Sequence, residues 1–223
     1  MWFIVVTCRS LMYTLISIGT LMLVFAAIAT PKWLIGKVER SKLYGNTTYR
    51  QSVGIYNRCT HVNNLVSQKL EPNCGIYATS FMKIDSKAWQ ACIVFLGIAI
   101  VLLGIAAFFA IMAFCKQICM DKSVLNLAGV LQGFAGLCLS VALITYPVGW
   151  TSARISRMCH GPNGESRAFQ IGQCQLGISY YFAIASCVGA FLGCLLSGFA
   201  DRSIFSSDVQ EEILEGKHLI CVP

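Results

Sequence analysis

The run AWQACIVFLGIAIVLLGIAAFFAIMAFC, residues 88–115, contains no Asp, Glu, Lys or Arg. A membrane-spanning helix needs about 20 consecutive, mainly apolar residues, so this run is long enough to cross a bilayer once. Three more long uncharged runs lie in the chain, at residues 10–31, 123–153 and 168–200. Only 12% of the 223 residues are charged, whereas a soluble domain carries roughly 25%. The sequence therefore predicts a membrane protein with four spans, near residues 11–30, 89–114, 124–146 and 176–200.

Two alternative interpretations fit these runs less well. A soluble all-α protein would bury such helices in its core, but core helices rarely stay apolar over this length. A cleaved signal peptide would account for Arg9 before the first run and for Ala27-Ile28-Ala29 near its end. The apolar region of a signal peptide is only about 7–15 residues long, however, and this run is longer. We therefore expect the first run to be a retained span, within a single tetraspan domain over residues 1–223.

The signals that place the connections on one side of the membrane disagree. The first and third connections, residues 31–88 and 147–175, carry twelve of the 17 Lys and Arg residues, so a simple positive-inside count would place them in the cytosol. That rule is weak for long loops. Asn46-Thr47-Thr48 is an N-glycosylation sequon, which is used only in the lumen. We therefore expect these two connections to lie outside, and both termini, with the tail over residues 201–223, to be cytosolic.

Each of these two outer connections contains one pair of cysteines. Cys59 and Cys74 lie in the first, Cys159 and Cys174 lie in the second, and fourteen residues separate the members of each pair. Paired cysteines form lasting disulfides only in an oxidising compartment, which agrees with an outer location. We expect one disulfide in each connection.

The first outer connection is long enough to form a small sheet. Strand-forming residues precede its first cysteine and follow its second: Val53, Ile55 and Tyr56, then residues 75–78. We expect an extracellular antiparallel sheet whose strands are joined by the first disulfide. A short helix is expected over residues 63–69. The second outer connection, rich in Gly and Ser, is expected to add an edge strand or a hairpin.

Small residues recur at helical spacing inside the spans, where they let two helix backbones approach closely. The pairs are Gly97 and Gly104 in the second span, Gly129 and Gly133 in the third, and Gly189 and Gly193 in the fourth. They are expected either to pack the four helices of one chain or to dock another membrane protein. We favour internal packing for spans two and three, and both interpretations stay open for span four. Gln132, an amide deep in the third span, is expected to form an interhelical hydrogen bond.

No arrangement of residues indicates catalysis or cofactor binding. The three histidines, His61, His160 and His218, have no metal-ligand spacing, and the sequence contains no nucleophile elbow, phosphate-binding loop or dinucleotide fingerprint. No span carries an acidic or basic residue that could form an ion path. We therefore expect neither an enzyme nor a cofactor, a metal ion or a nucleic-acid partner.

The outer connections are strongly basic. They contain twelve Lys and Arg residues against four Asp and Glu residues, a net charge of +8. A basic exterior suits acidic partners, such as glycans, anionic lipids or acidic proteins. An ordinary solvated surface is the alternative interpretation, and from the sequence we favour it.

Modification and sorting signals are predicted on the cytosolic side. Three cysteines lie at span ends and are candidate palmitoylation sites: Cys8, Cys115 and Cys119. In the tail, Glu215 followed by Leu219 and Ile220 fits the acidic dileucine pattern that clathrin adaptors bind. This pattern predicts traffic to endosomes or lysosomes as well as to the plasma membrane.

Several of these segments, taken in order, point to one family. Gly54-Ile55-Tyr56-Asn57-Arg58-Cys59 followed by Cys74 resembles the claudin superfamily signature G-L-W-x-x-C…C, with Tyr56 in place of the tryptophan. Further segments of the same kind are Thr7-Cys8-Arg9-Ser10, Trp33-Leu34-Ile35-Gly36, Leu131-Gln132-Gly133, Tyr146-Pro147-Val148-Gly149-Trp150, Val209-Gln210-Glu211-Glu212-Ile213 and Gly216-Lys217. Over nearly its full length the chain is similar to the lipoma fusion partner-like tetraspan family, and its tail resembles the second subfamily.

This resemblance implies a claudin-like fold, in which a left-handed membrane bundle of four α-helices carries a small extracellular antiparallel β-sheet. It also implies an auxiliary or scaffolding subunit that binds another integral membrane protein in the bilayer and helps its assembly or trafficking. Claudin-like adhesion or barrier formation between cells is the alternative, although Tyr56 argues against strand polymerisation of the claudin type. A lipid-linked role in endolysosomes is a third possibility.

Overall fold

The computed structural model describes residues 4–41, 47–64, 69–114, 118–119, 122–160, 167–204 and 219–222. The chain forms two compact units. The terminal unit, which contains both chain ends, comprises Met1–Val24, Leu96–Ser140 and Ala185–Pro223. The sheet unit comprises Phe25–Phe95 and Val141–Ile184. Each of the four long helices contributes one part to each unit.

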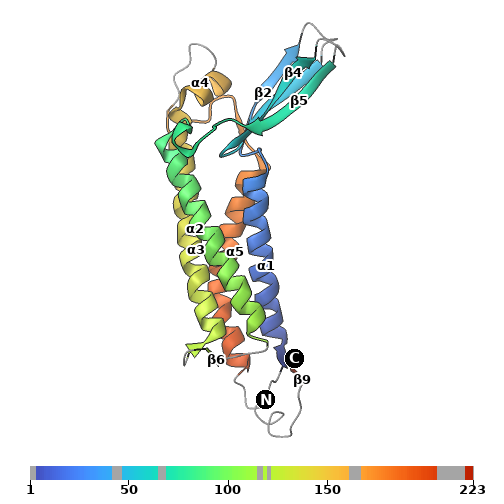
Figure 1. The fold of residues 1–223 in the computed structure, drawn as a ribbon, viewed down its shortest axis with the longest axis vertical. Helices are drawn as coiled ribbons and strands as arrows, with labels where there is room; N and C mark the ends of the chain where they lie inside the picture. Colours follow the sequence, from blue (N-terminus) through green and yellow to red (C-terminus); the bar gives the residue numbers. More distant parts are fainter. Residues whose placement is uncertain are drawn as a thin grey trace. The chain divides into compact units, whose positions relative to one another are not determined.

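Four long helices correspond to the four predicted spans (Figure 1). They are α1 (Cys8–Ala29), α2 (Lys87–Met112), α3 (Val124–Val148) and α5 (Ile178–Ile204). All four are long and apolar enough to cross a membrane. The prediction of a four-span membrane protein is therefore confirmed.

The start of α1 shows why this helix begins where it does. Thr7 Oγ1 accepts a hydrogen bond of 3.1 Å from the Ser10 backbone N–H, and Ser10 Oγ accepts one of 3.0 Å from the Thr7 backbone N–H. This reciprocal arrangement is that of a capping box, which satisfies two backbone donors that the first helical turn leaves unpaired. The Thr7-Cys8-Arg9-Ser10 segment therefore has a structural role at the entry of the first span.

Two of the three predicted small-residue pairs are used inside the terminal unit. Internal packing is wrong for the third pair, Gly97 and Gly104 of α2, because Cβ atoms there would meet no described atom within 4 Å. A Cβ atom at Gly129 would collide with Ser197 of α5, and one at Gly133 would lie 3.1 Å from Cys194 Sγ. From the other side, a Cβ atom at Gly193 would collide with the Gln132 side chain. Close approach of α3 and α5 thus requires these glycines, as internal packing predicts, and the docking interpretation of span four loses its small-residue surface.

Gln132 makes the interhelical hydrogen bond that its position suggested. Its side chain is fully buried, and its Nε2 donates a hydrogen bond of 2.6 Å to Ser17 Oγ on α1. Ser17 Oγ in turn donates to the Tyr13 carbonyl oxygen at 2.8 Å. The Gln132–Ser17 bond therefore ties α3 to α1, and the Ser17–Tyr13 bond orients the acceptor.

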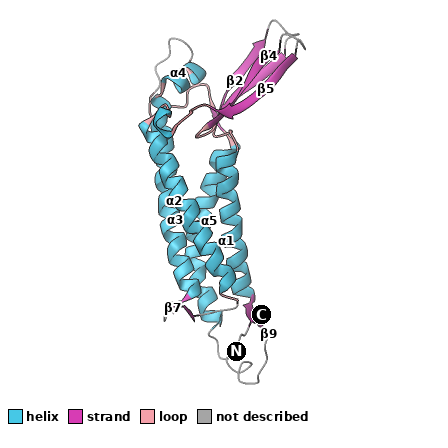
Figure 2. Ribbon diagram, in the orientation of Figure 1, coloured by secondary structure: helices cyan, strands magenta, loops and turns pink. Residues whose placement is uncertain are grey.

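The sheet unit contains a five-stranded antiparallel sheet (Figure 2). Its strands are β2 (Leu34–Ser41), β3 (Thr47–Val53), β4 (Asn57–Asn64), β5 (Lys69–Ile76) and β8 (Gln175–Leu176), in the order β5-β4-β3-β2-β8. The claudin-like fold class is therefore confirmed. Strand β8 is the edge strand expected from the second outer connection. At the opposite edge lies β5, and Pro72 is tolerated there because an edge strand has unpaired N–H positions.

The short helix expected over residues 63–69 does not form at either end of this range, and residues 65–68 lie outside the described residues. Asn63 and Asn64 belong to β4, Lys69 belongs to β5, and Asn64 pairs directly with Lys69. The antiparallel ladder from Asn57–Ile76 to Asn64–Lys69 decides this conformation, because cross-strand pairing overrides weak local propensity. A two-turn helix, α4 (Ala153–Cys159), forms instead in the second outer connection, where none was expected.

Aromatic side chains pack the helix ends of the sheet unit. Trp33, Trp89 and Tyr146 are fully buried, and the Trp89 and Tyr146 rings stack with centroids 5.5 Å apart. Both indoles are satisfied, because Trp33 Nε1 donates to the Ala27 carbonyl at 2.6 Å and Trp89 Nε1 donates to the Tyr146 carbonyl at 3.1 Å. Trp33 directly precedes β2, so this cluster lies where the helices lead into the sheet.

Two small pairs of strands complete the terminal unit. Strand β1 (Ile4–Thr7) pairs in parallel with β9 (Leu219–Val222), and β6 (Ile118–Cys119) forms a hairpin with β7 (Lys122–Ser123). The first pair joins the two ends of the chain.

Candidate functional site

The two disulfides brace the sheet unit. Cys59 and Cys74 are directly opposite residues of β4 and β5, with Cα atoms 4.1 Å apart, and they form the first disulfide. The second joins Cys159, at the end of α4, to Cys174, immediately before β8. Helix α4 is thereby held beside the sheet.

One face of the sheet presents arginine and polar side chains. Arg58 lies opposite Val53 of β3 and Gly75 of β5, and Thr60 lies opposite Asn73 of β5. Because side chains alternate along a strand, Arg58 and Thr60 share one face and Cys59 points to the other. The first disulfide therefore stiffens the strands that carry Arg58 without covering this face.

Helix α4 supplies two further arginines, Arg154 and Arg157. Arg154 forms an ion pair with Asp85, in which Nε donates to one carboxylate oxygen and Nη2 donates to the other at 3.3 Å. The two side chains are 29% and 23% exposed. The hydrogen bond to Asp85 raises the pKa of Arg154 above its ordinary value, so the guanidinium keeps its charge.

Tyr77 lies beneath this ion pair. The Arg154 guanidinium carbon sits 4.9 Å from the centre of the Tyr77 ring, a cation–π arrangement. The Tyr77 hydroxyl donates to the Ile55 carbonyl. Burial raises the pKa of the Tyr77 phenol, and the negative charge of Asp85 raises it further. Tyr77 and Asp85 together fix Arg154 in place.

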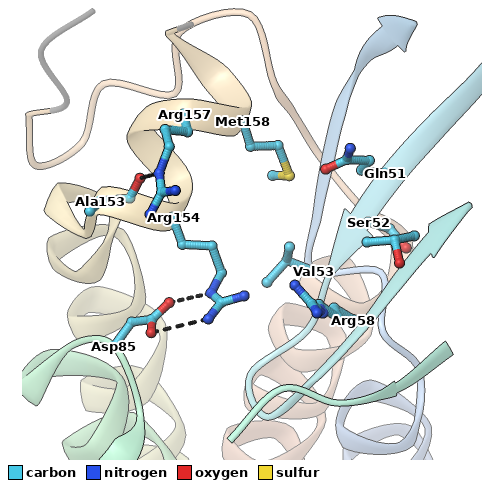
Figure 3. Close-up of a pocket in the computed structure, with 10 residues that line it drawn as sticks. Gln51, Ser52, Val53, Arg58, Asp85, Ala153, Arg154, Arg157 and Met158 are labelled. Carbon is cyan, nitrogen blue, oxygen red and sulfur yellow. Dashed lines mark hydrogen bonds and ion pairs between the residues drawn. The ribbon is translucent and has the colours of Figure 1, made fainter. Parts of the chain in front are cut away.

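A cavity of about 580 Å³ lies between the sheet face and α4 (Figure 3). Its lining residues come from β3, β4, α4 and the segment before α2: Gln51, Ser52, Val53, Arg58, Thr60, Asp85, Ala153, Arg154, Arg157 and Met158. The lining holds three guanidinium groups and one carboxylate, so its net charge is two positive. Figure 3 shows Arg154 turned to Asp85, with Arg58 on the facing strand.

Two of the three guanidinium groups have no carboxylate partner among the described residues. Arg157 Nε donates only to the Ala153 carbonyl of its own helix, at 3.2 Å. The Arg58 side chain has neither a hydrogen bond nor an ion pair in the part of the chain that the structure describes, and Arg58 is exposed. Their charge is therefore available to an anion that enters the cavity.

A second hollow, of about 120 Å³, adjoins the first. It is lined by Arg58, Thr60, Asn73, Gly75 and Ile76. The two hollows share Arg58 and Thr60, so together they form one hollowed surface that runs from α4 across β4 to the edge strand β5. We call it the arginine groove.

The other predicted site residues are dispersed over the chain. Asn46, Cys115 and Glu215 lie outside the described residues. Cys8 is an exposed free thiol at the start of α1, and Cys119 belongs to β6. The remaining two residues of the dileucine pattern, Leu219 and Ile220, belong to β9, where they pair with Ile4 and Val5 of β1.

The groove residues were not predicted individually. Arg58 was quoted only as part of the claudin-like signature, and Arg154 and Asp85 are 69 positions apart, so no local motif joins them. The available signal was the net charge of +8 in the outer connections. Among the described residues, no group of three or more His, Cys, Asp or Glu could hold a metal ion.

Comparison with known proteins identifies the family. The family model described as "Lipoma HMGIC fusion partner-like protein" matches residues 9–202. The "LHFPL tetraspan subfamily member 2a protein" of Danio rerio is 39% identical over 228 residues, and the human "LHFPL tetraspan subfamily member 2 protein" is 37% identical over 227, each match covering 98% of both chains. The "LHFPL tetraspan subfamily member 3 protein" of Danio rerio is 30% identical over 141 residues, 62% of this chain and 60% of the relative. The resemblance seen in the sequence is confirmed, and the chain belongs to the LHFPL tetraspan family of multi-pass membrane proteins.

Proposed function

We propose that this protein is a non-enzymatic auxiliary or scaffolding subunit, which binds another integral membrane protein and helps its assembly or trafficking. The arginine groove carries the proposal, because it offers unpaired guanidinium groups on a disulfide-braced surface. Arg is enriched at protein interfaces, where its planar group makes several hydrogen bonds at once. The groove contains no residue set that would move a proton or activate a nucleophile, so recognition is the chemistry that it supports.

Helix α2 offers a surface for lateral contact within the membrane. Gly97, Val101, Gly104 and Phe108 recur at helical spacing, so they lie on one face. Cβ atoms at Gly97 and Gly104 would meet no described atom within 4 Å, and Val101 and Phe108 are 59% and 57% exposed. Alternating small and large side chains let a second helix pack closely. Among the three predicted small-residue pairs, Gly97 and Gly104 therefore lie on a face that is open to a partner.

Gentle extraction tests the proposal. We expect the tagged full-length protein, solubilised in a mild detergent, to co-purify with a different integral membrane protein in a constant ratio. A complex that contains only copies of this chain would contradict the auxiliary role. In that case the claudin-like alternative, recognition between cells through the sheet, becomes the better account, and enrichment of the tagged protein at cell–cell contacts would support it.

The predicted topology and trafficking extend this proposal. With cytosolic termini, the sheet unit faces the lumen or the cell exterior, Asn46 is available for glycosylation, and Leu219 and Ile220 can meet clathrin adaptors.

Replacing Leu219 and Ile220 with alanine should increase the fraction of the protein at the cell surface and decrease the fraction in endosomes. A Cys221→Ala, Val222→Ala variant is the matched control, since it alters the same strand, and an equal shift in both variants would remove the sorting role.

A further inference from the structure

The arginine groove has the chemistry of a carboxylate-binding site. Arg58 and Arg157 approach it from different elements, one from a sheet strand and one from α4, and neither has a carboxylate partner among the described residues. Guanidinium groups bind carboxylates through paired, charge-assisted hydrogen bonds. The third guanidinium, on Arg154, is already held by Asp85. An incoming carboxylate would therefore bind to the guanidinium groups of Arg58 and Arg157. The Arg154–Asp85 ion pair holds the adjoining part of the lining in place.

The shape of the groove favours an extended chain over a compact anion. Its two hollows of about 580 and 120 Å³ share a ridge formed by Arg58 and Thr60, and they end beside different elements. Crossing two strands of a sheet covers about 10 Å, which corresponds to about three residues of extended peptide. A single sulfate or carboxylate would fill only a small part of this length.

The far end of the groove offers contacts that suit a peptide. The edge strand β5 contributes Asn73, an amide, and Gly75, whose missing side chain leaves the backbone accessible. Ile76, at the end of the strand, also lines the smaller hollow. Peptides commonly bind next to sheet edges through backbone hydrogen bonds and alternate side chains.

We propose that the arginine groove binds an extended acidic segment of a protein, with one carboxylate between Arg58 and Arg157 and the following residues along β5. The identity of this segment as part of a membrane-protein partner rests on the proposed function. The binding of an acidic peptide by the groove does not rest on the proposed function. The groove proposal and the proposed function can therefore fail separately.

Binding of a defined peptide tests the groove directly. The full-length protein, purified in detergent, is titrated against fluorescein-labelled hexaglutamate, and anisotropy is recorded at low and at physiological salt. We expect saturable binding that weakens with salt, and at least about tenfold weaker binding by the Arg58→Gln, Arg157→Gln double variant. Both side chains are exposed, so the variant should fold.

The matched control changes the same residue type on the other face of the sheet. Arg50 lies on β3 next to Gln51, it does not line the groove, and its Nη1 lies 3.4 Å from Gln175 Oε1. Arg50→Gln should change hexaglutamate binding less than about twofold, since it removes a positive charge outside the groove. Equal losses in both variants would show a general charge effect and overturn the proposal.

Competitors decide the class of ligand. Hexaglutamine should not compete, and 3′-sialyllactose or inorganic phosphate should compete only at much higher concentration than hexaglutamate. Stronger competition by either anion would assign the groove to a sugar acid or a phosphate and overturn the peptide proposal. Co-purification of a membrane partner without hexaglutamate binding would leave the auxiliary role standing and refute the groove. Hexaglutamate binding without co-purification of any heterologous partner would support the groove and refute the auxiliary role.

Discussion

Gly189 on α5 and Thr20 on α1 approach so closely that a methyl group at position 189 would lie 2.5 Å from the Thr20 hydroxyl oxygen. That oxygen donates to the Ile16 carbonyl at 2.7 Å, so it does not turn away freely. Next to this contact, Ser186 Oγ donates to the Thr20 carbonyl at 3.0 Å. Helices α1 and α5 are thus joined by a glycine contact and by a hydrogen bond.

This contact predicts a compensating pair of substitutions. Gly189→Ala should lower stability by about 1–3 kcal/mol, because overpacking forces the helices apart. Thr20→Ala removes the obstructing oxygen but leaves its backbone carbonyl for Ser186, so the double variant should recover most of the loss. Thermal unfolding followed by size-exclusion chromatography in detergent measures all three variants. A double variant as unstable as Gly189→Ala alone would contradict the geometry.

The open face of α2 predicts a loss of partner without a loss of fold. Gly97→Leu combined with Gly104→Leu fills this face with bulk that meets no described atom of the chain, and leucine favours the helix. Co-purification of the heterologous partner should fall about tenfold, equivalent to ~1.4 kcal/mol. Gly19→Leu on α1 is the matched control, because its Cβ also meets nothing within 4 Å. An equal effect of Gly19→Leu would exclude α2 as the contact.

The disulfides predict a folding defect in the sheet unit. Each closes a loop with a sequence separation of 15, and such a cross-link stabilises by about 3 kcal/mol. Replacing Cys59 and Cys74, or Cys159 and Cys174, with serine should therefore retain the protein in the endoplasmic reticulum. Surface biotinylation measures the effect, and Cys8→Ser, which changes a free thiol, is the control. Normal delivery of both double variants would disprove a bracing role.

Tyr77 predicts a dependence of stability on alkaline pH. Burial, reinforced by the Asp85 charge, raises the pKa of its phenol above 10.0. The folded protein therefore retains a proton that the unfolded chain loses, so this stabilisation is present below pH 10 and declines as the pH rises further. Tyr77→Phe should lower stability by about 1 kcal/mol at neutral pH, through the lost hydrogen bond to Ile55, and should weaken the alkaline decline. Thermal unfolding at neutral and alkaline pH measures the stability loss and the alkaline decline. Tyr181→Phe is the control. An unchanged alkaline decline in Tyr77→Phe would contradict the assignment of this pH dependence to Tyr77.

The spans were predictable because each depends on composition over one continuous run, such as residues 88–115. Gln132 and the glycine pairs of spans three and four were predictable as packing residues, whereas the pair in span two was expected to pack internally and instead lies on an open face. The sequence did not indicate which neighbouring helix each of these residues would contact. That contact depends on how each helix is rotated about its own axis, and only the packed structure defines this rotation.

The sheet was predictable in kind but not in extent. Strand-forming residues around Cys59 indicated it, but Asn63 and Asn64 are weak strand formers, and their strand conformation comes from pairing with Leu70 and Lys69. Helix α4 spans only seven residues, too short for a clear periodic pattern. The groove joins α4 to β4 and to Asp85, so its geometry could not be predicted from any one segment.

Site-specific photo-crosslinking from Thr60 shows what occupies the arginine groove in cells. A photoreactive phenylalanine analogue at this position stands on the ridge of the groove, and the same analogue at Arg50 stands on the other face of the sheet. In living cells that express the full chain, we predict that irradiation at Thr60 yields a covalent adduct with a different membrane protein, whose attachment point lies in an acidic segment. The Arg50 position should yield little of this adduct. Adducts at Thr60 that contain only a second copy of this chain would contradict the account.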